Sequence, residues 1–585
     1  MARLCVAAMG GLHLQRGADE TALQAARAQF ERHGFTDFTP VSAPPFTGFH
    51  AGPIHGGPAT FHADGDDFAA VSGTLVYDGR MGRDALAALL ADFRFPFTDW
   101  DTLAGQFALM VRKDGRSFLL TDYFAAFQLF HDADYTVFST SFLATAKALP
   151  RLEFDDQGLY EFAFNVFPTG NDTVLKGIAR LGPRMQLELG ERVSEARVEK
   201  PLPDRPVDIP LEERLERFAD VLRRKTAPFA AAYGDAMQCP LSGGLDSRLA
   251  LALLRDAGVS PHVYVYGSPG DTDVEIARTI AKGEGLALEP VEKAKLARIT
   301  PDDFAEIVER NFHETDALVT DGGLFDNGGN RLARHARQQG GQLAVSGGCG
   351  EVLRNFFFLP DQPMRAADLV RVFFARFTRA DVSDGFDQDR FLANLEDKAL
   401  RALDRPGDPG PLPRTLIEQL YPRMRCRAFF GREISLVGRQ GGYYMPFFDR
   451  ELVENAIGIP LSLKNAGVFE AKLLQHIDPG LAAYPSAYGH AFNEPPALSH
   501  RMSEFGTRVR PAWIRQRSYA VQRRLLPMGD EHGGLLTPAY LGRVIDLHFP
   551  HMSRYFRVPN IADSGLYRRV ATLEYLAQHL EDRLV

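Results

Sequence analysis

The pattern of apolar and polar positions divides the chain into a strand-rich first part and a second part in which strands alternate with helices. Short apolar runs bounded by turn residues predict strands at residues 4–8, 68–71, 73–77, 107–111, 117–121 and 135–139. Apolar positions in residues 21–33 recur with the spacing of an amphipathic helix. We therefore expect the first part to be a layered α/β or α+β domain.

The second part begins after residues 200–210, a segment with four prolines that is the clearest linker in the chain. Residues 236–239, 263–267 and 343–345 have the composition of buried strands, with helical patterns between them. This alternation predicts a parallel sheet and an α/β fold class. Residues 563–584 predict a last amphipathic helix, with Ala571, Leu573, Leu576 and Leu580 on one side. The expected division is 1–199, the linker 200–210, 211–500, and a basic helical extension at 501–585.

Composition limits the classes of function. A chain of 585 residues is too long for one core, and its net charge of −9 disfavours broad nucleic-acid or membrane-surface binding. No apolar run has the length of a membrane span. The four cysteines are scattered without metal-ligand spacing, which is typical of a reducing compartment, so we expect a cytoplasmic protein.

The strongest chemical signal is the loop Pro240-Leu-Ser-Gly-Gly-Leu-Asp-Ser-Arg248, which lies between a strand and a helix. Such a turn directs backbone N–H groups and a helix N-terminus at one point, which favours an anion. Gly243 and Gly244 allow a phosphate to approach the backbone, and Ser242 and Ser247 can donate hydrogen bonds. Asp246 suits this place if a cation bridges it to the phosphates. The alternative is a glycine-rich turn without a ligand.

These residues resemble the pyrophosphate-binding loop of enzymes that split ATP into AMP and pyrophosphate, and the resemblance to asparagine synthetases extends to about residue 500. It implies an ATP-pyrophosphatase fold with ATP and Mg²⁺ as cofactors. The implied nucleotide-binding residues are Leu241, Ser242, Gly243, Gly244, Asp246, Ser247, Tyr266, Gly267, Ser346 and Gly347. The implied catalytic residues are Asp246, Glu351 and Lys472, with Asp246 and Glu351 as the metal ligands. Glu351 as a surface or capping carboxylate, and Lys472 as a solvated side chain, are the alternatives.

Several positions depart from the family. Glu351 stands where the family has aspartate, and Gly348 and Gly442 replace side chains that assist the amine or bind substrate. The two glycines are expected to open the pocket for a bulky acceptor. The general base is left unassigned, with Tyr443, Tyr444 and Glu314 as candidates by neighbourhood alone.

The first part resembles the glutaminase domain of class II glutamine amidotransferases, through Leu103-Ala-Gly-Gln-Phe-Ala108 and Phe138-Ser-Thr-Ser141 among other segments. This implies an Ntn-type αββα layer fold. In that family the cysteine is the first residue and its own amine is the base. Cys5 is preceded by further residues, and Ser72 and Thr74 replace the Asn and Glu that hold glutamine. We expect a retained scaffold without glutaminase activity; an active glutaminase is the alternative.

Together these features predict ATP-dependent amide formation through an acyl-adenylate. The preferred family member is a lasso peptide cyclase, which closes a macrolactam in a precursor peptide. A precursor peptide and the pathway's leader-processing protease would then be the partners, without nucleic acid or membrane. The alternatives are amidation of a small metabolite or sugar acid with free ammonia, and a non-catalytic nucleotide-binding scaffold. Arginines of residues 501–524, among them Arg508, Arg510, Arg523 and Arg524, are either a solvated face or a dock for an acidic or phosphate-bearing partner.

Overall fold

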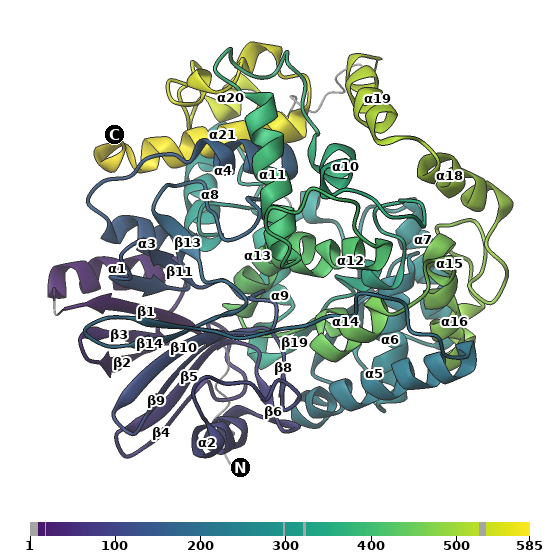
Figure 1. Ribbon diagram of the computed structural model, residues 1–585, viewed down its shortest axis with the longest axis horizontal. Coiled ribbons are helices and arrows are strands. Elements are labelled where there is room, and N and C mark those ends of the chain that lie inside the picture. The colour runs from purple at the N-terminus through teal and green to yellow at the C-terminus, as the bar shows by residue number, and fades with distance from the viewer. Residues whose placement is uncertain (1–9, 18, 297–298, 320–322, 526–533) are drawn as a thin grey trace.

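The computed structural model describes residues 10–17, 19–296, 299–319, 323–525 and 534–585 (Figure 1). The expected strand at 4–8 and Cys5 lie outside these ranges. For Arg523 and Arg524 the structure describes the backbone and not the side chains. Within them, no helix is both long and apolar enough to cross a bilayer.

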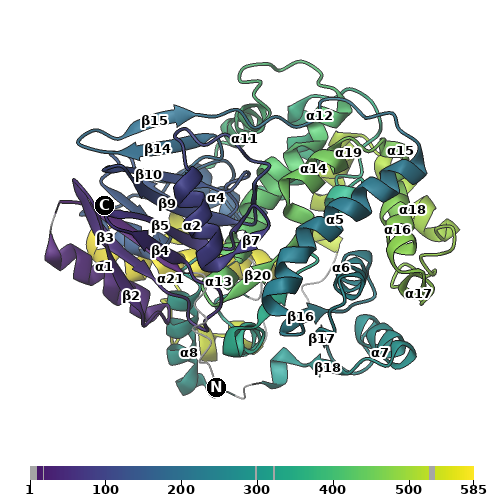
Figure 2. The same cartoon turned by 90° about the horizontal axis from the view of Figure 1, so that it is seen from below.

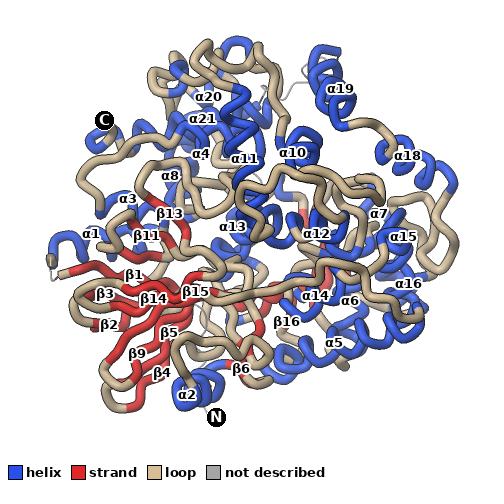
Figure 3. Tube along the Cα trace, viewed as in Figure 1, coloured by secondary structure: helices blue, strands red, loops and turns tan. Residues whose placement is uncertain are grey.

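Two antiparallel sheets form the first part of the chain, where Figure 3 shows most of the strands. The first has the order β13 (Ile178–Arg180), β11 (Phe130–Asp132), β12 (Val137–Ser139), β1 (Gly11–Arg16), β3 (Phe46–Ala51), β2 (Phe38–Ala43). The second has the order β15 (Ser194–Arg197), β14 (Met185–Leu189), β10 (Arg116–Thr121), β9 (Phe107–Lys113), β5 (Asp67–Gly73), β4 (Phe61–Asp64). The expected strand at 73–77 is divided in the structure. Gly73 is the last residue of β5, and Val76–Tyr77 form β6, which pairs with two short strands and joins neither sheet.

Helices cover the outer faces of both sheets. Phe30 of α1 (Glu20–Arg32) and Ala144 of α3 (Phe142–Ala148) form one apolar cluster with Phe49 of the first sheet. Leu89 of α2 (Gly82–Asp92) joins Leu109 of the second sheet in another cluster. The inner faces of the two sheets contribute to a third and larger core. The layer order is therefore helix, sheet, sheet, helix, as expected for an αββα fold.

A five-stranded parallel sheet organises the second part, so the α/β fold class is confirmed. Its order is β18 (Leu288–Val291), β17 (His262–Tyr266), β16 (Met237–Pro240), β19 (Leu343–Val345), β20 (Gly442–Tyr444). Its helices include α5 (Leu211–Tyr233), α6 (Leu245–Asp256), α7 (Thr272–Glu284), α8 (Pro301–Glu314), α9 (Gly329–Ala336), α13 (Arg427–Gly438) and α16 (Val468–Ile477). Strand order reverses at β16, so a binding crevice is expected at the carboxyl ends of β16 and β19.

The two parts share one continuous apolar core, which runs from β1 to the last helix. Buried Asp316 joins them, because its carboxylate accepts hydrogen bonds from the N–H groups of Phe142 (2.7 Å) and Leu143 (2.8 Å) at the start of α3. Arg439, on the parallel-sheet side, donates to the same carboxylate at 2.8 Å. Removing Asp316 would leave a buried arginine and a helix end without partners.

The chain end does not form one separate extension. The last helix, α21 (Ser564–His579), buries the four apolar residues that the sequence placed on one side, and it packs on α4 (Asp156–Asn165) of the first part. The N–H of Val585 donates to the carbonyl of Leu152 at 3.0 Å. By contrast, α18 (Leu498–Arg508) and α19 (Ala512–Leu525) lie at the periphery beyond the parallel sheet (Figures 1 and 2).

Candidate functional site

The loop after β16 is held in shape by its own hydroxyls. Ser247 Oγ accepts from the N–H of Ser242 at 3.0 Å and lies 2.8 Å from Ser242 Oγ. Ser242 Oγ in turn accepts from the N–H of Gly244 at 3.2 Å, and Asp273 Oδ1 accepts from the N–H of Gly243 at 2.9 Å. The loop leads directly into α6, whose N-terminal N–H groups favour negative charge. An anion at this loop would compete with Asp273 and Ser242 for the glycine N–H groups.

The loop after β19 packs directly on Asp246, and two glycines make this approach possible. A Cβ at Gly347 would lie 2.9 Å from the backbone carbon of Asp246, and one at Gly350 would lie 1.8 Å from Asp246 Oδ1. Any side chain at either position would separate the two loops. Ser346 Oγ accepts from the N–H of Gly348 at 3.1 Å, which shapes the turn.

A charged cluster surrounds Asp246. Arg354 donates from Nη2 to Asp246 Oδ2 at 2.6 Å, and its Nε lies 3.2 Å from Glu470 Oε2. Its remaining nitrogen donates to the hydroxyl of Tyr488 at 3.0 Å. One guanidinium therefore serves two carboxylates and a phenol. Arg354, Glu470 and Tyr488 were not identified from the sequence.

Burial dominates the protonation of this cluster. Glu470 is fully buried, and burial followed by the charge of Asp246 raises its pKa well above the usual range. Burial opposes the charge on Arg354, yet the charges of Asp246 and Glu470 raise the pKa of this guanidinium. The cluster thus keeps one fixed positive charge beside two carboxyl groups that cannot both remain charged at low cost.

The residues around Asp246 fit a magnesium ion. Asp246 Oδ1 is buried and receives no hydrogen bond from any residue that the structure describes, which is costly unless a further partner approaches it. Glu351 accepts from the Tyr421 hydroxyl at 2.6 Å, and its charge contributes to the raised pKa of Glu470. Mg²⁺ prefers one or two carboxylates completed by water and phosphate oxygens, so a closed cage of protein ligands is not required.

A cavity of about 250 Å³ opens at the crevice between β16 and β19. Its lining includes Tyr264, Tyr266, Ser346, Arg334 and Lys293, with Lys293 Nζ 3.8 Å from the centre of the Tyr266 ring. Aromatic rings and three cationic side chains, Lys293, Arg334 and Arg337, suit a nucleotide. Tyr266 and Ser346, which the resemblance implied as nucleotide contacts, line this cavity, while Gly267 stands in the turn that follows β17, with φ of +147°.

The same cavity holds a hydrogen-bonded acid that sequence reasoning missed. Tyr443 donates to Glu433 Oε1 at 3.1 Å, and both residues line the cavity. Burial, with the charge of Glu433, raises the pKa of the Tyr443 phenol well above its usual range. Of the three base candidates named from the sequence, Tyr443 alone lies here. Tyr444 pairs with Thr226 at 2.9 Å, and Glu314 receives a hydrogen bond from Gln440.

The structure does not bring Lys472 to this site. Lys472 is exposed on α16, whereas Glu470, two positions earlier, is completely buried beside Arg354. Two residues of an α-helix are about 200° apart, so the two side chains leave opposite faces. The buried residues of α16 are Phe469, Glu470, Leu473 and Leu474. They form two pairs four positions apart, a spacing that marks the inward face of the helix and can be seen in the sequence.

The expectation that Gly348 and Gly442 open the pocket is wrong. A Cβ at Gly348 would lie 2.8 Å from Met445 Cε and from a ring carbon of Phe430. A Cβ at Gly442 would lie 2.6 Å from the Tyr233 hydroxyl. Neighbouring side chains therefore fill the space that larger residues would have taken.

At the place that resembles a glutaminase pocket, two polar side chains make contacts between the two parts of the chain. Thr74 Oγ1 donates to the carbonyl of Tyr443 at 2.7 Å, and Gln106 Nε2 donates to that of Phe448 at 3.4 Å. Phe124 stacks on Phe448 with ring centres 4.9 Å apart. This edge of the first part therefore packs against β20 and the short turn that follows it.

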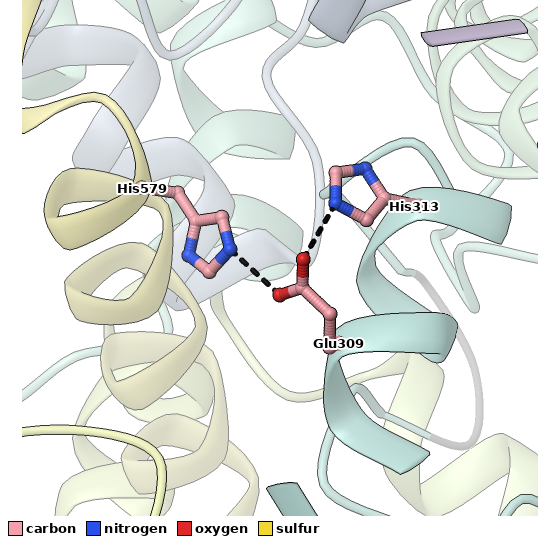
Figure 4. Close-up of side chains that lie close together, drawn as sticks. All are labelled: Glu309, His313 and His579. Atoms are coloured by element: carbon pink, nitrogen blue, oxygen red, sulfur yellow. Dashed lines mark hydrogen bonds and ion pairs between the residues drawn. The ribbon is translucent and has the colours of Figure 1, made fainter. Parts of the chain in front are cut away.

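A second cluster of metal-type ligands lies between α8 and α21 (Figure 4). Among the described residues, Glu309, His313 and His579 are the only group of three His, Cys, Asp or Glu close enough to share one ion. The Glu309 oxygens already lie 2.9 Å from His313 Nε2 and 2.7 Å from His579 Nε2, and Tyr575 donates to one of them at 2.7 Å. Arg32 brings a further positive charge, 2.7 Å from His313 Nε2. We interpret the group as a set of polar contacts that joins α1, α8 and α21.

Comparisons with known proteins give little beyond the fold. No protein-family model and no curated protein matches the chain. Among solved structures, the glutamine phosphoribosylpyrophosphate amidotransferase of B. subtilis, in complex with ADP and GMP, is similar at 11% identity and a TM-score of 0.22. This match covers 48% of the present chain and 65% of the amidotransferase. A structure described as the allosteric regulatory enzyme of purine biosynthesis matches at 12% identity and a TM-score of 0.21, covering 50% and 68% of the two chains. Similarity this low carries no argument about function, which must come from the geometry of the site.

Proposed function

We propose that this protein is an AMP-forming amide ligase that activates a carboxylate with ATP and passes the acyl group to an amine. The observation that carries the proposal is the placement of Asp246. Its buried Oδ1, which has no hydrogen-bond partner in the described part of the chain, lies between the loops that follow β16 and β19, beside a cavity with aromatic and cationic walls. That combination suits a nucleotide whose phosphates enter the Ser242–Ser247 loop with a bridging cation.

When bound, ATP and Mg²⁺ would supply the activated phosphorus and neutralise the charge of the leaving pyrophosphate. Asp246, with Glu351 nearby, would hold the metal, and the N-terminus of α6 would favour the departing anion. Arg354 would keep its positive charge against the phosphates, because two carboxylates already raise its pKa. Glu470 fixes Arg354 from the opposite side and is in this account a positioning residue.

The second half of the reaction needs a group that takes a proton from the attacking amine. Glu433 accepts a hydrogen bond from Tyr443 inside the cavity, so its carboxylate can hold a proton close to the acyl-adenylate. Glu433→Gln should therefore slow amide formation far more than pyrophosphate release. Equal losses in the two steps would remove Glu433 from this role.

For the amine we favour one supplied by the substrate itself, as in macrolactam closure of a precursor peptide. The support is that the pocket edge that would release ammonia is engaged in contacts with Tyr443 of β20 and with Phe448, through Thr74 and Gln106. The leader-processing protease of the same pathway would then be a partner that prepares the peptide.

The product tests this proposal. Given ATP, Mg²⁺ and a linear peptide with a free N-terminus and an Asp or Glu side chain, the enzyme should yield a peptide lighter by one water that resists Edman degradation. A product that keeps its free N-terminus and gains an amide from added ammonia would instead support amidation of small acids. ATP binding without any nucleotide product, over a panel of peptides and small carboxylic acids, would indicate a non-catalytic scaffold.

A further inference from the structure

Helices α18 and α19 carry an unusual concentration of exposed apolar side chains. Half of the large apolar residues that are exposed in the described chain fall within residues 498–521: Leu498, Met502, Phe505, Val509, Trp513 and Val521. Exposed fractions run from 52% at Val521 to 69% at Leu498. We call these six residues, with the arginines between them, the platform. Exposed apolar residues concentrated in this way point to an interaction site.

Helix α18 exposes its apolar face, whereas an ordinary surface helix buries that face. Leu498, Met502, Phe505 and Val509 follow one another at spacings of four, three and four, which places them on one face. That face is turned to solvent, while polar residues hold the helix to the protein. Glu504 accepts from the N–H of Ala466 at 2.7 Å. Burial of apolar surface does not explain this arrangement, so the apolar face is available for a partner.

The charge of the platform defines its partner. Residues 498–517 contain five arginines, Arg501, Arg508, Arg510, Arg515 and Arg517, and one acid, Glu504, in a protein whose net charge is −9. Arg508 lies over the ring of Phe505 at 5.6 Å and Arg517 over that of Trp513 at 5.4 Å, so positive charge and apolar surface share the same face. A partner with acidic residues among apolar ones complements both properties.

The platform is also continuous with the candidate site. The ring of His500, on α18, lies 5.2 Å from that of Tyr488, and the Tyr488 hydroxyl accepts from Arg354 of the Asp246 cluster. At the other end, Arg515 donates to the carbonyls of Phe357 (3.2 Å) and Phe358 (3.0 Å), which anchors α19. A chain bound on the platform can thus continue toward the charged cluster.

We propose that the platform docks an acidic amphipathic segment of the peptide substrate and so presents the reacting part of that peptide to the site at Asp246. This rests on the proposed ligase function for the identity of the peptide as substrate. Docking itself requires only the surface, so the two ideas can fail separately.

The test uses two fluorescein-labelled 20-residue peptides with the same leucines and phenylalanines, one with glutamates and one with lysines at every other position. Fluorescence anisotropy with the full chain should show the glutamate peptide binding about tenfold or more tightly than the lysine peptide, with affinity that falls as salt rises. The double variant Met502→Glu/Phe505→Glu should weaken binding by about tenfold or more. Leu547→Glu, at another exposed apolar residue, is the matched control and should bind as the wild type does.

Equal binding of the two peptides, or a double variant that binds normally, would overturn the proposal. Sedimentation with phosphatidylglycerol vesicles and sedimentation velocity of the protein alone complete the test. Vesicle binding or dimer formation lost in the double variant, with no binding of the glutamate peptide, would assign the platform to a membrane or to a second copy and also overturn it. Absence of pyrophosphate release from the wild type with ATP, Mg²⁺ and the peptides would contradict the ligase function while leaving the peptide-binding result in force.

Discussion

Two places in this molecule contain the residue types of an active site, and their polar groups are used in different ways. At the place that resembles a glutaminase pocket, Thr74 and Gln106 donate hydrogen bonds to backbone carbonyls of the parallel-sheet part. At the edge of the parallel sheet, Asp246 keeps a buried oxygen that receives no hydrogen bond from the described residues, and burial raises the pKa of Glu470 well above its usual range. Polar groups whose hydrogen bonds join two parts of a fold contribute to stability. Buried polar groups that lack a hydrogen bond or have a strongly shifted pKa are typical of a functional site.

The largest effect is expected from Asp246→Asn, which leaves the shape of the site but removes the charge that would hold the metal. Pyrophosphate release should fall on the order of 10²-fold or more. A coupled pyrophosphatase assay measures this directly. Thr74→Val is the matched change at the other place, and it should leave the rate within about twofold, because Thr74 serves packing between the two parts.

The next effect separates the two faces of α16. Glu470→Ala should lower pyrophosphate release by about tenfold or more, because Arg354 loses one of the two carboxyl groups that hold it. Lys472→Ala should change the rate little, since this side chain is exposed. Steady-state kinetics of the two variants decide between them: a severe loss in Lys472→Ala with a normal Glu470→Ala would restore the role that the family resemblance gave to the lysine.

A smaller effect concerns stability in the first part of the chain, where burial lowers the pKa of His13 to about 4, of His33 to about 3 and of His50 to about 4. The unfolded chain takes up protons at these residues near pH 6.5, while the folded protein does not. Acidification below pH 6.5 therefore favours unfolding, by about 1.4 kcal/mol per pH unit for each histidine, and the effect levels off at the folded pKa.

The histidine prediction can be checked by urea unfolding at pH 7, 6 and 5. His13→Phe should reduce the pH slope, since one titrating group is lost and the new ring can pack on Phe49, 5.6 Å from the present ring. His62→Asn, at a partly exposed histidine of β4, serves as the control. An unchanged slope in His13→Phe would show that His13 is not a source of the acid sensitivity.

The smallest effect is expected at Cys5. Cys5→Ala should leave ligation unchanged, and the wild type should release no glutamate from glutamine, because Ser72 and Thr74 stand where the resembling family has the residues that hold glutamine. Glutamate release that disappears in Cys5→Ala would show that the glutaminase-like part is active.

The sequence predicted the architecture well because periodicity and glycine turns act locally. The strands at 107–111 and 117–121, the helix at 21–33 and the loop at Ser242 all appear where their patterns placed them. The charged cluster was predicted only in part. Long-range packing brings Arg354 and Glu470 to the Asp246 cluster and Glu433 to the cavity. No local pattern in the sequence indicates which face of each helix is turned inward. Lys472 shows the opposite difficulty, since a matching motif does not fix the side chain's direction.

The clearest test of the proposed chemistry follows the oxygen of the carboxylate. A linear peptide with ¹⁸O in its Asp or Glu side-chain carboxylates is incubated with the enzyme, ATP and Mg²⁺, and the nucleotide product is analysed by mass spectrometry. If the carboxylate attacks the α-phosphorus, AMP should be the product and carry one ¹⁸O from the peptide. ADP as the product, or AMP without the label, would contradict an acyl-adenylate formed at Asp246.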